Sequence, residues 1–197
     1  MQIDTKVLAE LGGTIRTAKK GETIFAQGDY PHFYFQIIEG KVKMISTTSE
    51  GKEYIQGIFT DGESFGEPPL FVNEVYPASA IASSFVNYYR LPVSVFFEIL
   101  EQNPSILMIF TRIFARRIYN KTLSVNDLIT NTPEFRIFGM LKNYKKRNCI
   151  TDERVLIPFT RQEIAHFTGL RVETVIRTLR IMKEEKKVII ENRKLYF

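Results

Sequence analysis

Short apolar runs separated by glycines fill the chain between Gly21 and Leu91. Seven of the eleven glycines lie between Gly21 and Gly66, and the intervening runs, such as 33–38 and 41–45, are rich in aromatic and β-branched residues. Short runs at nearly regular spacing are typical of β-sandwiches and barrels. Glycine suits the turns between them because it adopts positive φ without steric cost. This region is therefore predicted to be a β-rich domain.

A longer periodicity, typical of an α-helix, starts at about Asn103. Positions that are mostly apolar recur at alternating spacings of 4 and 3 from Leu107 to Leu128. A 3.5-residue repeat is typical of the seam between two paired helices. Phe110 and Ile113 lie beside this seam and are placed to pack against the β domain. The alternative is a long helix buried inside a monomer. We expect a dimerisation helix whose seam contains Leu107, Phe114, Ile118, Val125 and Leu128.

The C-terminal third has the pattern of two short helices joined by a tight turn. Thr160 and Glu163 have the spacing of a capping box, which marks a helix start. Gly169 suits a sharp turn, and a second helix is expected to start near Arg171. Together these features form a helix-turn-helix pattern. The apolar residues expected to face the core are Ile164, Ala165, Val172, Val175, Leu179 and Met182.

A small β-hairpin is predicted at the end of the chain. Residues 187–197 consist of an apolar run, a polar turn at 191–194 and a second apolar run. A hairpin that follows the second helix would form the wing of a winged helix. Arg193 and Lys194 lie at its tip, where they contact either a phosphate or only solvent.

These patterns predict an α+β protein in three parts. The β-rich domain is expected over residues 1–102, the dimerisation helix and hinge over 103–131, and the winged helix-turn-helix domain over 132–197. The third part starts at Thr132, whose side chain suits the cap of a helix that begins with Pro133.

Composition excludes several classes of function. The chain has 197 residues, and no apolar run approaches the ~20 residues of a membrane helix. Its N-terminus lacks a secretion-signal pattern, and its one cysteine, Cys149, cannot form an internal disulfide, so a cytoplasmic location is expected. Two histidines and one cysteine cannot assemble a zinc, cupin-type or iron–sulfur centre. We therefore expect no membrane contact, no metal, no cofactor and no enzyme such as a metal-dependent cupin.

Charge is unevenly distributed along the chain. Residues 130–197 contain 15 Lys+Arg and 8 Asp+Glu, a net charge of +7, whereas the rest of the chain has a net charge of −2. A basic third beside a nearly neutral remainder favours a module that binds a polyanion. The alternative is a solvated basic face with no partner.

The outward face of the second helix carries side chains that can read DNA. Arg donates two hydrogen bonds to guanine, and a carboxylate accepts one from cytosine. Glu173 and Arg177 are one helical turn apart, so they can address neighbouring base pairs; the alternative is a surface ion pair. We expect phosphate contacts as well, because these fix the register of a protein on DNA. The candidate DNA-binding residues are Thr160, Arg161, Gln162, Arg171, Glu173, Thr174, Arg177 and Arg180.

Five segments carry a resemblance to a known family. They are KGETIFAQGD, FYFQIIEGKVKM and GIFTDGESFGE in the β domain, and TRQEIA and VETVIR in the helix-turn-helix. In this order, from Gly21 to Phe197, they resemble the CRP/FNR family of bacterial transcription regulators. The resemblance implies a jelly-roll, or double-stranded β-helix, sensor domain like those that bind cyclic nucleotides. It also implies a homodimer on a palindromic double-stranded DNA operator, an effector in the β-roll that reorients the DNA domains, and contact with RNA polymerase.

Within the family, the second helix is closer to the FNR branch. Val172, Glu173, Thr174 and Arg177 match that branch, whereas the CRP branch has Arg where Val172 stands. Ile176 occupies the branch's Ser position, which replaces a hydroxyl contact with a surface suited to a thymine methyl. The resemblance implies half-sites related to TTGA.

The effector pocket departs from the family pattern. Cyclic-AMP receptors hold the cyclic phosphate with an Arg–Ser or Arg–Thr pair, which falls here on Pro77 and Ala78. Glu67 stands where the family uses a carboxylate for ribose, with a structural role as the alternative. We therefore expect no cyclic-AMP binding in the usual mode; a regulator switched by a cyclic nucleotide or another small molecule is the alternative. The candidate pocket residues are Phe65, Gly66, Glu67, Ala78, Ser79, Lys121 and Thr122.

Overall fold

The computed structural model describes residues 2–130, 132–148, 150–152 and 154–197, without the side chains of 123–130 and 147. It contains two compact units, which are unit 1 (Met1–Ala115) and unit 2 (Arg116–Phe197). Helix α4 (Pro104–Thr130) contains the boundary between them. Its range agrees with the long helix expected over 103–131.

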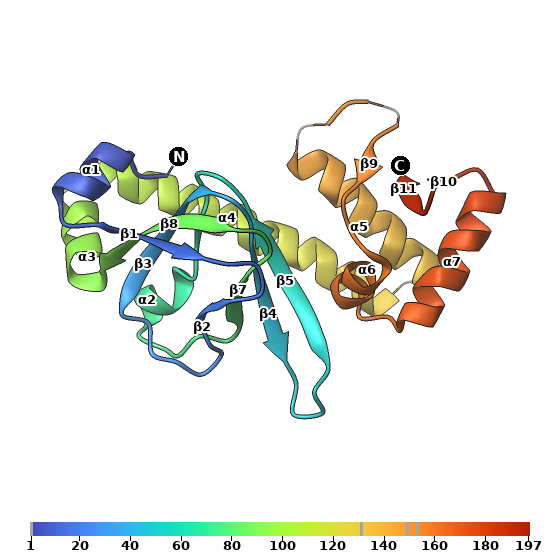
Figure 1. The fold of residues 1–197 in the computed structure, drawn as a ribbon, viewed down its shortest axis with the longest axis horizontal. Coiled ribbons are helices and arrows are strands. Elements are labelled where there is room, and N and C mark those ends of the chain that lie inside the picture. The colour runs from blue at the N-terminus through green and yellow to red at the C-terminus, as the bar shows by residue number, and fades with distance from the viewer. Residues whose placement is uncertain (1, 131, 149, 153) are drawn as a thin grey trace. The chain divides into compact units, whose positions relative to one another are not determined.

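Unit 1 is built on two antiparallel sheets, each with four strands in the described residues (Figure 1). One sheet has the order β1-β8-β3-β6 and the other β2-β7-β4-β5. The expectation of a β-sandwich or barrel in this region is confirmed. The strands are β1 (Thr14–Ala18), β2 (Thr23–Phe25), β3 (Phe33–Glu39), β4 (Val42–Thr47), β5 (Glu53–Phe59), β6 (Ser64–Phe65), β7 (Ser79–Ala82) and β8 (Val86–Pro92).

Strand β3 is buried on both faces, which explains the unbroken apolar run at 33–38. Successive side chains of a strand point to opposite faces. Phe35 and Ile37 therefore point into the space between the sheets, whereas Tyr34 packs in a second cluster on the opposite face. Tyr34 stacks on Phe96 with 4.5 Å between ring centroids.

Four helices accompany the sheets in the described part of unit 1. All four contribute to the second cluster, and Phe110 of α4 is fully buried there, as expected from its position beside the seam. No single helix in the described chain is long and apolar enough to span a bilayer; α3 and α4 together are, but they meet at a 110° bend. The helices are α1 (Thr5–Glu10), α2 (Pro68–Val72), α3 (Val93–Gln102) and the first part of α4.

Unit 2 contains the expected winged helix-turn-helix (Figure 1). Helix α5 (Pro133–Arg147) starts after Thr132, whose hydroxyl caps it as the sequence predicts. Helices α6 (Arg161–Thr168) and α7 (Val172–Glu184) follow, and a sheet of order β10-β11-β9 completes the unit. Its strands are β9 (Leu156–Ile157), β10 (Ile189–Glu191) and β11 (Lys194–Tyr196).

The apolar residues predicted to face inward do form the core of unit 2. Ile164, Ala165, Val175, Leu179 and Met182 are buried, and Val172 packs partly against them. Helix α5 and the sheet supply the other side of this core, which contains Ile137, Leu141, Ile157, Val188 and Leu195.

Candidate nucleic-acid interface and effector pocket

The start of α6 is fixed by a reciprocal capping box. The Thr160 hydroxyl accepts from the Glu163 backbone N–H at 3.1 Å, and the Glu163 carboxylate accepts from the Thr160 N–H at 2.8 Å. The Thr160 hydroxyl also donates to this carboxylate at 3.0 Å, so its hydrogen-bonding capacity serves the helix start. Gln162 is exposed, and its side-chain nitrogen lies 2.6 Å from Nε2 of His166. Thr160 thus positions the neighbouring Arg161 and Gln162.

Helix α7 separates an apolar face from a charged one. Gly169, with φ of 65°, ends α6, and Arg171 then precedes α7 in an extended conformation with an exposed side chain. Glu173, Arg177 and Arg180 are exposed, and Thr174 is half-buried. In the chain as described, no ion pair joins Glu173 to Arg177, although a pair of this kind was the alternative to base reading. Arg180 does pair with Glu184, at 3.3 Å.

A depression of about 430 Å³ lies between the start of α6, helix α7 and the wing. Leu179 and two isoleucines line it together with four cationic side chains. Burial lowers the pKa of Arg161, but an Arg guanidinium remains protonated at neutral pH. The sequence analysis did not include Lys183 among the candidate residues. Its spacing of three from Arg180, which puts both on one face of a helix, could have identified it. The cationic side chains are Arg161, Arg180, Lys183 and Arg193.

The wing turns as its sequence predicts. Asn192 and Arg193 both have positive φ, 48° and 62°, which is the backbone of a type I′ hairpin turn. Lys194 follows at the start of β11 and is exposed. Arg154 forms an ion pair with Glu191 at the base of this turn. The turn therefore presents two basic side chains, of which Arg193 lines the depression.

The candidate effector residues of unit 1 lie in or next to its interior. Phe65 and Ala78 are fully buried, and a Cβ on Gly66 would approach the ring of Phe25 to 2.8 Å. Glu67 is also fully buried and accepts a hydrogen bond from the Ser64 hydroxyl, which is the structural role considered as its alternative.

The other candidate effector residues do not face a common space within unit 1. Ser79 is half-buried, and its hydroxyl accepts from the Gln27 backbone N–H at 2.9 Å. Lys121 and Thr122 belong to unit 2 and are exposed; the Thr122 hydroxyl donates to the Ile118 carbonyl at 3.1 Å. The structure thus groups Phe65, Gly66, Glu67 and Ala78 within unit 1, whereas Lys121 and Thr122 belong to unit 2.

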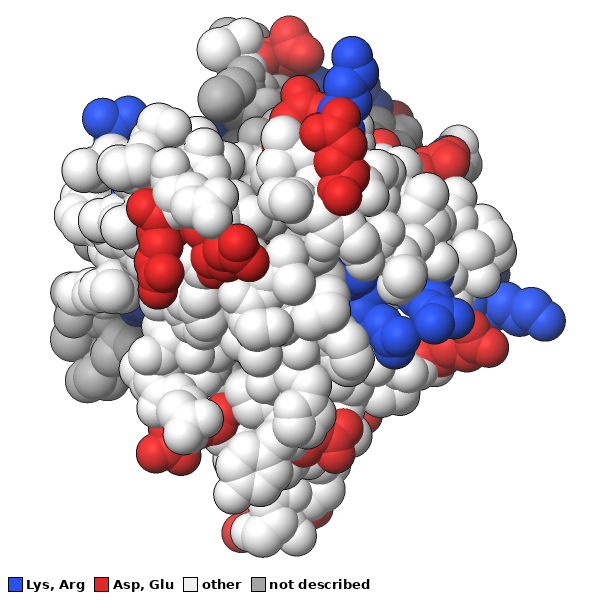
Figure 2. All heavy atoms as spheres, turned by 90° about the vertical axis from the view of Figure 1, so that its left-hand side faces the viewer, with Lys and Arg blue, Asp and Glu red and all other residues white. Residues whose placement is uncertain are grey.

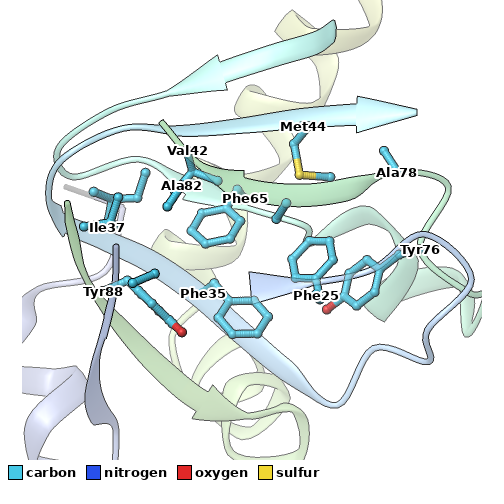
Figure 3. Close-up of a cluster of buried hydrophobic side chains, with 13 residues drawn as sticks. Phe25, Phe35, Ile37, Val42, Met44, Phe65, Tyr76, Ala78, Ala82 and Tyr88 are labelled. Atoms are coloured by element: carbon cyan, nitrogen blue, oxygen red, sulfur yellow. The ribbon is translucent and has the colours of Figure 1, made fainter. Parts of the chain in front are cut away.

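Aromatic rings occupy the space between the two sheets. Figure 3 shows Phe25, Phe35, Phe65, Tyr76 and Tyr88 pointing toward one another from both sides. The rings of Phe25 and Tyr76 stack at 3.7 Å between centroids, and those of Phe35 and Phe65 at 5.4 Å. These residues are far apart in the sequence, so no local pattern could have identified the cluster.

The seam residues of α4 have different surroundings. Phe114 packs partly against unit 1, where its ring centroid lies 5.2 Å from that of Phe71. Leu107 and Ile118 are exposed. Val125 and Leu128 lie outside the described side chains. The exposed members leave an apolar surface along this helix.

No three His, Cys, Asp or Glu side chains gather at a common point among the residues that the structure describes. Cys149 lies outside them.

Two family models match the chain in the order of its units. The model of the cyclic nucleotide-binding domain matches residues 15–103, and that of the Crp-like helix-turn-helix domain matches residues 136–196.

Similar proteins come from several bacteria. The transcriptional activator protein anr of Pseudomonas aeruginosa is 28% identical, over 98% of this chain and 80% of its own. The cAMP-activated global transcriptional regulator CRP of Haemophilus influenzae is 31% identical, over 86% of this chain and 76% of its own.

Solved structures share the fold. The c-di-GMP responsive global regulator CLP of Xanthomonas campestris has a TM-score of 0.83, with 18% identity and 98% of each chain covered. FixK2 of Bradyrhizobium japonicum has a TM-score of 0.78, with 18% identity, over 93% of this chain and 91% of its own. The matched domains and the identity to the Haemophilus relative agree with the geometry described above. The chain belongs to the CRP/FNR family of transcription regulators, and it combines an effector-type β-roll with a Crp-like helix-turn-helix domain that binds DNA.

Proposed function

We propose that this chain is a sequence-specific regulator that binds a palindromic operator as a homodimer. The observation that carries the proposal is the two-faced helix α7. Val175, Leu179 and Met182 fix it in the core, while Glu173 and Arg177 remain exposed. The N-terminal part of a recognition helix reaches base edges in the major groove.

Glu173 and Arg177 are the proposed base readers. Arg177 donates to guanine, and Glu173 accepts from the amino group of cytosine in an adjacent base pair. Ile176, exposed between them, provides an apolar contact for a thymine methyl. The preferred half-sites are related to TTGA. Arg161, Gln162, Arg171, Thr174 and Arg180 contact phosphates and fix the register, because phosphate contacts position a protein without reading sequence.

The proposed dimer forms along α4, between the β domain at 1–102 and the DNA domain at 132–197. Leu107, Ile118 and Tyr119 are 42%, 66% and 60% exposed in the single chain, more than apolar side chains of a monomer's core helix would be. Pairing of two chains covers this surface and places two recognition helices about 34 Å apart, one turn of DNA. The relatives named as transcriptional activator proteins support an activator that contacts RNA polymerase in the cytoplasm.

The β-roll of the proposed regulator does not bind cyclic AMP in the usual mode. Pro77 and Ala78 replace the pair that would hold the phosphate, and the stacked rings of Phe25 and Tyr76 occupy interior space. A cyclic-AMP switch is the second candidate, since several relatives carry that activity in their names.

An in vitro selection tests this proposal. The full chain, without added ligand, is challenged with random double-stranded DNA at about 150 mM salt. Enrichment of a TTGA-related palindrome supports it. The enrichment should be lost in the double variant Glu173→Ala/Arg177→Ala and kept in Arg136→Ala, the control in α5. Enrichment only after cyclic AMP is added supports the second candidate. A consensus unchanged by the double substitution overturns the assignment of the base readers.

A further inference from the structure

A recess in unit 1 is lined by residues other than the candidate effector residues. It has a volume of about 160 Å³ and opens beside β2, β3, β8 and the loop that joins β2 to β3. Phe65, Gly66, Glu67, Ala78 and Ser79 are not among its lining residues. Its walls are mainly aromatic, and they include Phe25, Phe33, Phe35, Tyr76, Tyr88 and Arg90.

Arg90 brings a buried donor to this recess. Side chains alternate between the two faces of β8, so Arg90 lies on the same face as Val86 and Tyr88. Those two belong to the cluster of buried side chains between the sheets, called the interior cluster below. The guanidinium lies over the ring of Phe33, with 4.3 Å between its central carbon and the ring centroid. Its Nε is buried and has no hydrogen-bond partner in the part of the chain that the structure describes. A buried charged donor without an acceptor is costly.

Tyr76 brings a second such donor. Its ring is held by the stack on Phe25, and its hydroxyl is buried with no hydrogen-bond partner among the described residues. Burial raises the pKa of this phenol, and the charges of Glu67 and Asp29 raise it further, so the hydroxyl keeps its proton. Buried polar atoms without partners are rare in native proteins. Two of them at one recess indicate that an acceptor is missing from it.

The acidic groups near the recess do not supply that acceptor. Asp29 lines it, but one of its carboxylate oxygens accepts from the Ala26 backbone N–H at 2.8 Å within the turn. Glu22 and Arg16 lie near enough to Tyr88 to shift its pKa in opposite directions, although burial is the main cause of its raised value. Near Tyr88, the negative charge of Glu22 is therefore opposed by two positive charges, those of Arg90 and Arg16.

We propose that this recess binds a small aromatic monocarboxylate, with its carboxylate on Arg90, its ring against the aromatic walls and an oxygen accepting from Tyr76. Size supports a single ring, because an apolar cavity of roughly 150 Å³ in another protein holds benzene. Arginine suits the charged end, since its hydrogen bonds to a carboxylate are charge-assisted. This inference goes beyond the proposed DNA reading and requires none of the residues of unit 2.

Titration of the full chain with sodium benzoate tests the proposal. Benzamide, which has the same ring and size without the charge, is the matched ligand control. Calorimetry and NMR shifts should show saturable benzoate binding, with benzamide at least about tenfold weaker. Arg90→Gln should weaken benzoate binding about tenfold or more, and Tyr76→Phe, which keeps the stack, about threefold to tenfold. Arg112→Gln, at an exposed position of unit 1, should leave it unchanged.

Several outcomes would overturn the proposal. They are equal binding of benzamide and benzoate, no saturable binding up to about 10 mM, or unchanged binding in Arg90→Gln. Thermal unfolding by circular dichroism checks that each variant is folded. If Arg90→Gln does not fold, Tyr76→Phe and the benzamide comparison decide. DNA binding is measured on the same samples and tests the proposed function separately. Failure of benzoate binding therefore does not imply failure of operator binding, or the reverse.

Discussion

The two units differ in where their polar side chains lie. Unit 1 buries several of them in its interior, whereas unit 2 exposes its proposed base readers on its surface. In unit 1, Gln36, Ser64 and Glu67 are fully buried, and the Gln36 amide bonds both the carbonyl and the N–H of Ile3. In unit 2, the proposed base readers Glu173 and Arg177 are exposed, and the buried Thr168 hydroxyl bonds the helix backbone, at 2.7 Å. Unit 2 can therefore bind a partner without disturbing its core, whereas a ligand inside unit 1 must compete with packing.

The side chains of the two cores differ in kind. Five aromatic rings are buried in the interior cluster of unit 1, whereas the buried residues of the unit 2 core are aliphatic, with aromatic rings only at its edge. Their surfaces differ as well. Figure 2 shows mainly uncharged side chains, with scattered acidic and basic ones, on the face near α1 and α3. Residues 130–197, in contrast, have a net charge of +7.

Removing a ring from the interior of unit 1 is the strongest test of this comparison. Phe65 is fully buried among four other aromatic rings, so Phe65→Ala should lower the free energy of unfolding of unit 1 by about 3–5 kcal/mol. Urea unfolding followed by circular dichroism measures this. Phe85→Ala, at a ring 57% exposed, should change it by less than about 0.5 kcal/mol. Similar losses for both would mean that the interior is not tightly packed.

Removing a charge from the outer face of unit 2 should leave stability nearly unchanged and affect binding. Arg177→Ala should cost roughly 1–3 kcal/mol of operator affinity and relax specificity at one base pair. Fluorescence anisotropy with the operator and with scrambled DNA measures both. The control Arg136→Ala should retain discrimination between the two DNAs. Wild-type discrimination in Arg177→Ala would remove this residue from the recognition surface.

Thr160 is a candidate DNA-binding residue by its sequence, but in the structure its hydroxyl caps a helix. Thr160→Ala should destabilise unit 2 by about 1 kcal/mol, since the first turn of α6 loses its cap. Thermal unfolding measures the change, and Thr151→Ala, at an exposed position outside helices and strands, is the matched control. An unchanged midpoint together with weaker DNA binding would show that Thr160 acts through phosphate and not through the cap.

The exposed ion pairs of Lys187 should have the smallest effect. Hydrogen bonds to Glu134 at 2.6 Å and Glu185 at 2.7 Å raise its pKa to about 12 from the ordinary lysine value of 10.5. Because the folded pKa is raised, this stabilisation is complete below pH 10.5 and is lost as the pH rises through 12. The difference in melting temperature between wild type and Lys187→Met should therefore be small and constant from pH 7 to pH 10. A difference that grows over this range would contradict the assignment.

Local patterns in the sequence were sufficient for most of unit 2. The stripe from Val175 to Met182, the capping box at Thr160 and the turn at Gly169 each depend on residues within one or two helical turns. Helical periodicity fixes which side faces the core, and it thereby also identifies Glu173 and Arg177 as outward. The same reasoning placed Phe110 against the β domain, because its spacing is helical too.

By itself, the sequence determined the order of elements, the winged helix and the outward face of α7, because each rests on periodicity or on capping over a few residues. Only the tertiary structure decided what fills the β-roll. Phe25 and Tyr76 are 51 positions apart and stack only because strand pairing brings their segments together. The same pairing places Arg90 of β8 opposite Phe35 of β3 and leaves two buried donors at one recess. Contacts between strands depend on register and on sheet packing, and neither is encoded within a local window.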